Sequence, residues 1–257
     1  MKKLLLTSAV IFLLACAPAL GATYYVDAVN GDNLNNGTAT ETPWKTISYS
    51  ATNSASGDII NVLPGLYNSA NGEKFPINMG GTKEVVGTDP NSCTVECSAA
   101  NDVFRATLNA TFRNLTVTTN NSLNGIYITG INANINNCIF RTVDGYGTGI
   151  NFQSGGAGNV TNCQMYRLGY SMFVSSGAGL QVQVTYCTME GADSSTYAGI
   201  YVNGASGDTA NLLIARYNYI YSTTFLGSSQ GIQITTNPCV ATMEYNSIIG
   251  YYSGVQN

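Results

Sequence analysis

The sequence predicts an all-β fold, a parallel β-helix in which about eight coils stack behind a short N-terminal helical cap. Two short apolar motifs alternate along most of the chain, and each recurs every 22 to 32 residues. Only 9% of the residues are charged, against roughly 25% in an ordinary globular domain. A hydrophobic fraction of 44% with 17 tyrosines argues against low-complexity disorder.

Residues 1–22 predict a signal peptide. Lys2 and Lys3 precede an apolar run over residues 4–15, which is too short to span a bilayer. Small residues follow, as at a signal-peptidase site. Residues 13–16 also fit a lipobox, so lipidation at Cys16 is the alternative to simple secretion. Either route predicts a secreted or cell-surface protein, and no other segment is long enough for a membrane span.

Residues 23–257 are predicted to form a single β-helix domain, which opens with a strand, a loop and a cap helix over residues 23–57. Thr42 followed by Pro43 is typical of an N-cap and a first helical position. The residues expected on the buried face and then at the end of this helix are Trp44, Ile47, Ala51 and Ser56-Gly57. Such a helix would cover the open end of the first coil, which a solenoid requires.

The first motif has six residues, with apolar side chains at positions one and six. Its six copies span residues 112–117, 135–140, 160–165, 184–189, 215–220 and 243–248. Position three is Asn114, Asn137 and Asn162 in the first three copies, and asparagine tolerates a left-handed backbone. We therefore expect a tight bend at this position, with the amides stacked along the solenoid axis.

The second motif is a four-residue strand with alternating apolar side chains. Its copies start at Gly125, Gly149, Ser171, Gly199, Gly231 and Gly254, and weaker copies of both motifs lie between residues 59 and 106. Two strands in a coil of this length exclude a β-sandwich, whose strands come roughly every 8–12 residues. Within residues 58–257, equivalent strands of successive coils would instead stack in parallel, about 4.8 Å apart. The last copy ends the chain inside a strand, so we expect a longer native protein or a partner over this end.

Residues 23 to 87 contain a series of short stretches, which are Tyr24-Tyr25-Val26-Asp27, Pro43-Trp44-Lys45-Thr46-Ile47, Gly57-Asp58-Ile59-Ile60 and Pro64-Gly65-Leu66-Tyr67. This series resembles the opening of bacterial right-handed parallel β-helix proteins of the pectate-lyase-like superfamily. They are similar to a domain of unknown function that begins many such proteins, and to the start of family 9 polysaccharide lyases. The resemblance implies a right-handed parallel β-helix outside the cytoplasm, with carbohydrate as the ligand class. It does not by itself imply catalysis.

The cysteines are interpreted as structural. Cys138, Cys163 and Cys187 occupy position four in three successive copies of the first motif, as expected for stacked free thiols in a core. Cys93 and Cys97 are too far apart along a strand for a direct disulfide unless the chain turns. The paired Cys-x-x-Cys spacing of a zinc site is missing from the sequence. We therefore expect no cofactor, apart from a structural calcium ion considered next.

The N-terminal loop places oxygen donors at short spacing, at Asp27, Asn30, Asp32 and Asn36. These donors could hold a calcium ion. A series of Asx turns explains the same residues, and no glutamate closes the loop as an EF-hand requires. Both interpretations are consistent with the sequence.

Five charged residues follow copies of the first motif, and they are Arg141, Asp144, Arg167, Glu190 and Asp193. We expect them in the loop before the second motif, with Arg141 and Glu190 in one coil register. Surface pairing between coils is one interpretation. The resemblance implies another, since this loop lines the substrate cleft in that superfamily and an arginine could act as base in a β-elimination. The coils have no lysine after Lys83, whereas family 9 lyases use one there, which argues against lyase activity.

The outward positions of the second motif form a row of candidate binding residues. They are Tyr127, Asn151, Phe173, Tyr201 and Gln233. Aromatic rings and amides in a row suit a sugar chain, and the alternative is a ladder that only stabilises the sheet. Arg141 and Arg167 beside this row would favour an acidic glycan.

Composition narrows the function further. The chain has no histidine, which excludes Ser-His-Asp and Cys-His catalysis. Its formal charge of -4 argues against a nucleic-acid partner. We expect a secreted or surface-attached, non-catalytic β-helix that contacts polysaccharide. The alternatives are a calcium-assisted, pectate-type lyase that uses Arg141 or Arg167, and a structural or adhesive surface stalk without a small ligand.

Overall fold

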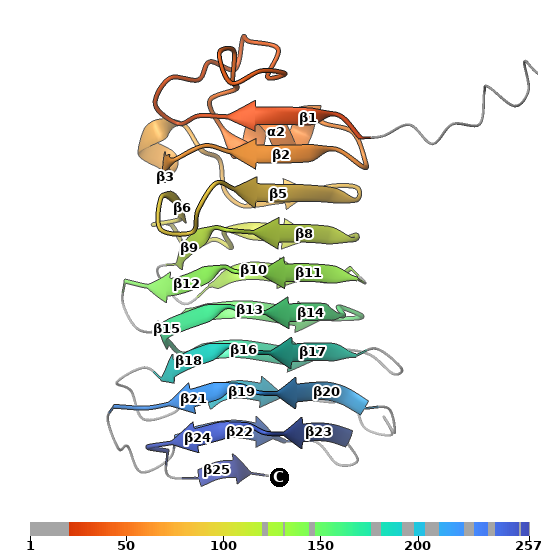
Figure 1. The fold of residues 1–257 in the computed structure, drawn as a ribbon, viewed down its shortest axis with the longest axis vertical. Helices are drawn as coiled ribbons and strands as arrows, with labels where there is room; N and C mark the ends of the chain where they lie inside the picture. The colour runs from red at the N-terminus through yellow and green to blue at the C-terminus, as the bar shows by residue number, and fades with distance from the viewer. Residues whose placement is uncertain are drawn as a thin grey trace, which may run out of the picture.

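Three parallel sheets run the length of the molecule. The computed structural model describes residues 21–119, 123–130, 132–143, 147–175, 181–191, 198–203, 211–223, 229–235, 240–251 and 253–256. Eight successive coils each add one strand to each sheet, and β1 adds a ninth strand to one of them. Figure 1 shows the coils stacked along the long axis and winding with a right hand. The predicted right-handed parallel β-helix of about eight coils is therefore confirmed.

Each sheet takes every third strand of the coils. Sheet I consists of β1 (Thr23–Val26), β2 (Ile59–Val62), β5 (Lys83–Gly87), β8 (Ala110–Arg113), β11 (Ala133–Asn136), β14 (Gly158–Thr161), β17 (Val182–Thr185), β20 (Asn211–Arg216) and β23 (Val240–Glu244). Sheet II consists of β3 (Gly65–Tyr67), β6 (Cys93–Glu96), β9 (Thr116–Thr119), β12 (Ile139–Thr142), β15 (Gln164–Leu168), β18 (Thr188–Gly191), β21 (Tyr219–Tyr221) and β24 (Ser247–Ile249). Sheet III consists of β4 (Ile77–Met79), β7 (Phe104–Ala106), β10 (Asn124–Ile128), β13 (Thr148–Gln153), β16 (Tyr170–Ser175), β19 (Ala198–Val202), β22 (Gln230–Ile234) and β25 (Ser253–Gln256).

The prediction of two strands per coil is wrong, because the first motif is a corner between two strands. Each copy ends a strand of sheet I, bends and begins a strand of sheet II. The bend itself is where the sequence predicts it: φ is 57° at Asn114, 51° at Asn137 and 55° at Asn162. The predicted amide stack is also present, since Asn137 Nδ2 donates to Asn114 Oδ1 at 2.9 Å.

The interior of the solenoid is apolar, with one column of small and polar side chains at position four of the first motif. Cys138, Cys163 and Cys187 are buried free thiols in this column, as predicted. Burial raises the pKa of the Cys163 thiol. Asn218 continues the column and is also buried. Its Oδ1 accepts the backbone N–H of Cys187 at 2.9 Å, so the buried amide is paired.

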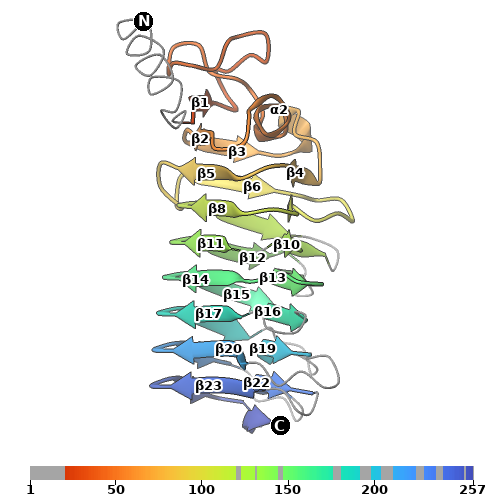
Figure 2. The same cartoon turned by 90° about the vertical axis from the view of Figure 1, so that its right-hand side faces the viewer.

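A cap helix, α2 (Ile47–Asn53), lies at the N-terminal end as predicted, but its start is different (Figure 2). Pro43 does not begin it, and Thr46 is the N-cap, whose hydroxyl accepts the N–H of Tyr49 at 3.2 Å. Trp44 instead forms a parallel β-bridge with Val26. This pairing extends the backbone before the helix can start.

The buried carboxylate of Glu73 holds the cap helix on the first coils. Glu73 accepts hydrogen bonds from the backbone N–H groups of Ile47 and Ser48, the first two residues of α2. Burial raises the pKa of Glu73.

α2 ends at Asn53, before the predicted stop at residues 56–57, and a short 3-10 helix, η1 (Ser69–Asn71), follows β3. Within the described part of the chain, no helix has the length and apolar character needed to cross a bilayer.

Candidate functional site

The outward residues of sheet III lie in one register from β4 to β22. We call them the outer row, and they are Asn78, Arg105, Tyr127, Asn151, Phe173, Tyr201 and Gln233. All five binding residues predicted on the second motif belong to this row and are half-buried. Adjacent members lie one strand spacing apart, about 4.8 Å. The row is therefore a continuous line of ring and amide groups along the long axis of the solenoid.

Three aromatic rings meet in the middle of the outer row. Phe173 and Tyr201 stack with centroids 5.1 Å apart and an interplanar angle of 24°. Tyr170, which the sequence prediction missed, packs 5.9 Å from Phe173 and 5.2 Å from Tyr201. The hydroxyl of Tyr201 accepts a hydrogen bond from Thr235 at 3.1 Å. These contacts fix the rings in place before any ligand arrives.

A buried carboxylate organises the row beside this aromatic cluster. Asp102 accepts from Arg105 Nε at 2.6 Å and from Asn124 Nδ2 at 2.7 Å. Arg105 lies with its guanidinium 5.9 Å from the centre of the Tyr127 ring, a cation–π distance. Asn124 Oδ1 accepts from Asn151 Nδ2 at 2.9 Å, and Asn151 Oδ1 has no partner among the described residues. The sequence prediction missed Arg105, although it takes the place of Tyr127 in a weaker copy of the second motif.

Three of the five predicted charged residues, Arg141, Arg167 and Glu190, lie on strands of sheet II and not in a loop beside the outer row. Arg141 on β12 pairs in register with Tyr166, and Tyr166 pairs with Glu190 on β18, so the predicted shared register is confirmed. The predicted loop position is wrong, because strands β12, β15 and β18 continue through these residues. Arg167 lies at a register shift in β15 with φ 57°. Asp144 and Asp193 lie outside the described residues.

A second aromatic feature occupies the corner between sheets I and II. Tyr186, Tyr217 and Tyr245 hold position three of the last three copies of the first motif, and we call them the tyrosine ladder. Their φ angles are 56°, 58° and 58°. Adjacent rings stack at 5.1 and 5.0 Å, each with an interplanar angle of 5°, and all three side chains are exposed. A bend was predicted at the asparagines that hold this position in the first three copies, but not at the tyrosines that replace them.

The oxygen donors of the N-terminal loop are engaged in local turns. Asp27 Oδ1 accepts from the N–H groups of Val29 at 2.8 Å and Asn30 at 3.0 Å. Burial by itself raises the pKa of Asp27, but these backbone hydrogen bonds outweigh it and lower the pKa. Asn36 Oδ1 accepts from Thr38 N–H at 3.1 Å in the same manner. The arrangement is typical of Asx turns, and calcium binding there stays a prediction.

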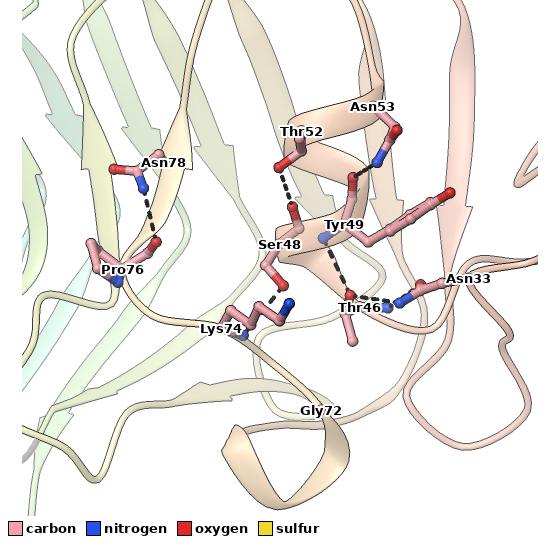
Figure 3. A pocket seen from close by; sticks show the side chains of 10 residues that line it. All are labelled: Asn33, Thr46, Ser48, Tyr49, Thr52, Asn53, Gly72, Lys74, Pro76 and Asn78. Carbon is pink, nitrogen blue, oxygen red and sulfur yellow. Dashed lines mark hydrogen bonds between the residues drawn. The ribbon is translucent and has the colours of Figure 1, made fainter.

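A cavity of about 340 Å³ opens at the N-terminal end of the outer row (Figure 3). One wall is the exposed side of α2, and the other is the segment that leads from η1 into β4. Its lining presents polar and apolar surface in about equal amounts and consists of Asn33, Thr46, Ser48, Tyr49, Thr52, Asn53, Gly72, Lys74, Pro76 and Asn78. No sequence motif pointed to this cavity, because it forms between segments about 25 residues apart. Residues 1–20 of the predicted signal peptide, including Cys16, lie outside the described residues.

Solved structures with a similar fold share little sequence identity with this chain. A rhamnogalacturonan lyase matches with a TM-score of 0.50 and 13% identity, over 83% of this chain and 73% of the lyase chain. A GH136 lacto-N-biosidase from Eubacterium ramulus matches with a TM-score of 0.27 and 11% identity, over 88% of this chain and 68% of that chain. At these identities the first similarity concerns the fold alone. No curated protein sequence matches the chain.

One sequence family covers most of the β-helix. Its description is "Protein of unknown function (DUF1565)", and it matches residues 29–203. The match runs from the loop after β1 through the coil that ends with β19, and it includes the outer row from Asn78 to Tyr201. Because the match covers more than half of the sequence, this protein belongs to the DUF1565 family.

Proposed function

We propose that this protein binds polysaccharide along the outer row without cleaving it, as a secreted or cell-surface protein. The observation that carries the proposal is the common register of ring and amide side chains on one exposed face of sheet III. A glycan is a linear repeat of hydroxyl-bearing rings, so a linear repeat of strands can meet it at several points. The predicted signal peptide places the proposed role outside the cytoplasm.

The chemistry of the outer row suits sugar rings. Asn151 and Gln233 lie on either side of the Phe173–Tyr201 pair, and their amides offer both donors and acceptors to hydroxyl groups. An aromatic contact contributes on the order of 1 kcal/mol. Because Phe173 and Tyr201 already stack on each other, binding would immobilise few free side chains, which reduces its entropic cost. We expect affinities of about millimolar to micromolar.

The lyase alternative has less support from the geometry. Its proposed bases, Arg141 and Arg167, lie on sheet II, whereas the aromatic cluster lies on sheet III. Arg105 does belong to the outer row, but its guanidinium is paired with the buried Asp102 carboxylate. A guanidinium has N–H donors and no acceptor, so Arg105 is suited to bind an anion and not to abstract a proton.

The test is calorimetric binding of a galacturonate hexasaccharide and of a neutral hexasaccharide to the full chain. The double variant Phe173→Ala/Tyr201→Ala removes a stacked ring pair and is expected to weaken binding about tenfold. The matched control is Tyr186→Ala/Tyr217→Ala, which removes a stacked pair of exposed rings from the tyrosine ladder. This control should bind like the unaltered protein.

Three outcomes would contradict the proposal. Equal binding by the Phe173→Ala/Tyr201→Ala variant and the unaltered protein would reduce the outer row to a structural ladder. Steady release of unsaturated product from polygalacturonate in the presence of calcium would establish lyase activity in place of binding alone, if Arg167→Ala abolishes it. Absence of binding to any glycan would favour the surface-stalk alternative.

A further inference from the structure

The cavity beside α2 has the size of a small ligand site. Its volume of about 340 Å³ lies at the lower end of the range of ligand pockets, which is roughly 300–1,000 Å³. Figure 3 shows α2 on one side, Pro76 and Asn78 on the other, and Lys74 between them. The cavity therefore has room for a small polar group and is walled by secondary structure on both sides.

Several polar groups of this cavity have no partner within the described part of the protein. Asn53 Nδ2 donates to the Tyr49 carbonyl at 2.8 Å, and Asn78 Nδ2 donates to the Pro76 carbonyl at 3.2 Å. These bonds leave the two amide oxygens free to accept. The hydroxyl of Tyr49 has no hydrogen bond to a described residue. The cavity thus presents donors and acceptors in the mixture that a sugar ring needs.

Lys74 adds a positive charge to the cavity. Its backbone N–H donates to Ser48 Oγ at 3.3 Å, and its side-chain ammonium forms no ion pair with a described residue. The side chain is exposed at the cavity. An ammonium group that faces a cavity favours an anionic ligand, since a charge-assisted hydrogen bond is about twice as strong as a neutral one.

The cavity also lies at the end of the outer row. Asn78 lines the cavity and is in register with Arg105, the next member of the row. β4 is the edge strand of sheet III, and α2 packs beside it at the N-terminal end of the solenoid (Figure 2). A glycan that lies along the row in the direction of β4 would therefore meet α2 there.

We infer that this cavity binds the terminal residue of an acidic polysaccharide, with the carboxylate of a uronic acid on Lys74. The inference rests on the proposed function of the outer row. It adds that the protein recognises the end of a glycan and not only its interior. The distance from Asn78 to Tyr201 is five strand spacings, about 24 Å, so a short oligosaccharide can reach the aromatic cluster and the cavity together.

The charge contact is tested by calorimetry with the galacturonate hexasaccharide and its carboxyl-reduced form. Lys74→Met is expected to weaken binding of the galacturonate hexasaccharide about tenfold and to leave binding of the reduced form unchanged. The matched control is Lys45→Met, which removes the same charge from an exposed lysine outside the cavity lining. It should bind both sugars like the unaltered protein.

End recognition is tested with the same protein and longer galacturonate chains. If the cavity holds the terminus, affinity per molecule stays constant from the hexasaccharide to the polymer. If binding is interior, affinity per molecule rises with the number of registers the chain offers, and end recognition is overturned. Undiminished binding by Lys74→Met together with weakened binding by Phe173→Ala/Tyr201→Ala would overturn the cavity inference and leave the outer row standing. Absence of any binding would overturn both.

Discussion

Replacing Asn218 by alanine is expected to lower the free energy of unfolding by about 3 kcal/mol. Asn218 is buried, and its amide accepts from Cys187 N–H at 2.9 Å and donates to the Val184 carbonyl at 3.0 Å. Alanine leaves both backbone groups buried and without these partners, and each such loss costs about 1–3 kcal/mol. Denaturant unfolding followed by circular dichroism measures the change.

The matched control for Asn218 is Asn159→Ala. Asn159 is also an asparagine of the coils, but it is exposed and donates to Asn134 Oδ1 at 3.1 Å. Its replacement should change stability by about 0.5 kcal/mol or less, as is usual for surface sites. Equal losses in the two variants would show that the buried amide does not support the corner.

Gly158→Ala is expected to destabilise the middle of the solenoid by about 3 kcal/mol or more. A Cβ at this position would lie 1.9 Å from the carbonyl oxygen of Ala133, which is its partner on the adjacent strand β11. The φ angle of Gly158 is also +156°, where residues with a side chain are strained. Both effects force β14 away from β11, and thermal unfolding would report them as a lower midpoint.

Gly80→Ala provides the comparison, because a Cβ at Gly80 would have no atom within 4 Å. Its expected change is about 0.5 kcal/mol or less. If Gly158→Ala unfolds at the same temperature as Gly80→Ala, the close approach of β11 and β14 at this point is wrong.

The fold was predictable because the two motifs repeat through most of the chain, whereas single local patterns were less informative. The left-handed bends at Asn114, Asn137 and Asn162 follow from residue type and position. Sheet II was not predicted, because a six-residue motif with one corner reads as one irregular strand. Thr42 and Pro43 have the pattern of a helix start, but the adjacent Trp44 pairs with Val26 of β1. Tertiary contacts often override short local signals in this way.

The candidate site was also predictable only in part. Outward alternation places Tyr127 and Tyr201 on one face, so the outer row follows from periodicity alone. The hydrogen bond from Asn124 to the buried Asp102 and the cavity around Lys74 depend on contacts between distant segments. The repeat pattern carries no information about such contacts, and only the folded structure brings these residues together.

The most direct measurement is a crystal structure of the protein soaked with the galacturonate hexasaccharide. We expect density for an intact oligosaccharide over sheet III, with one end beside Lys74 and its sugar rings along the outer row toward Phe173 and Tyr201. Density on sheet II or on the tyrosine ladder would contradict binding along the outer row. Density for a cleaved product would contradict binding without catalysis.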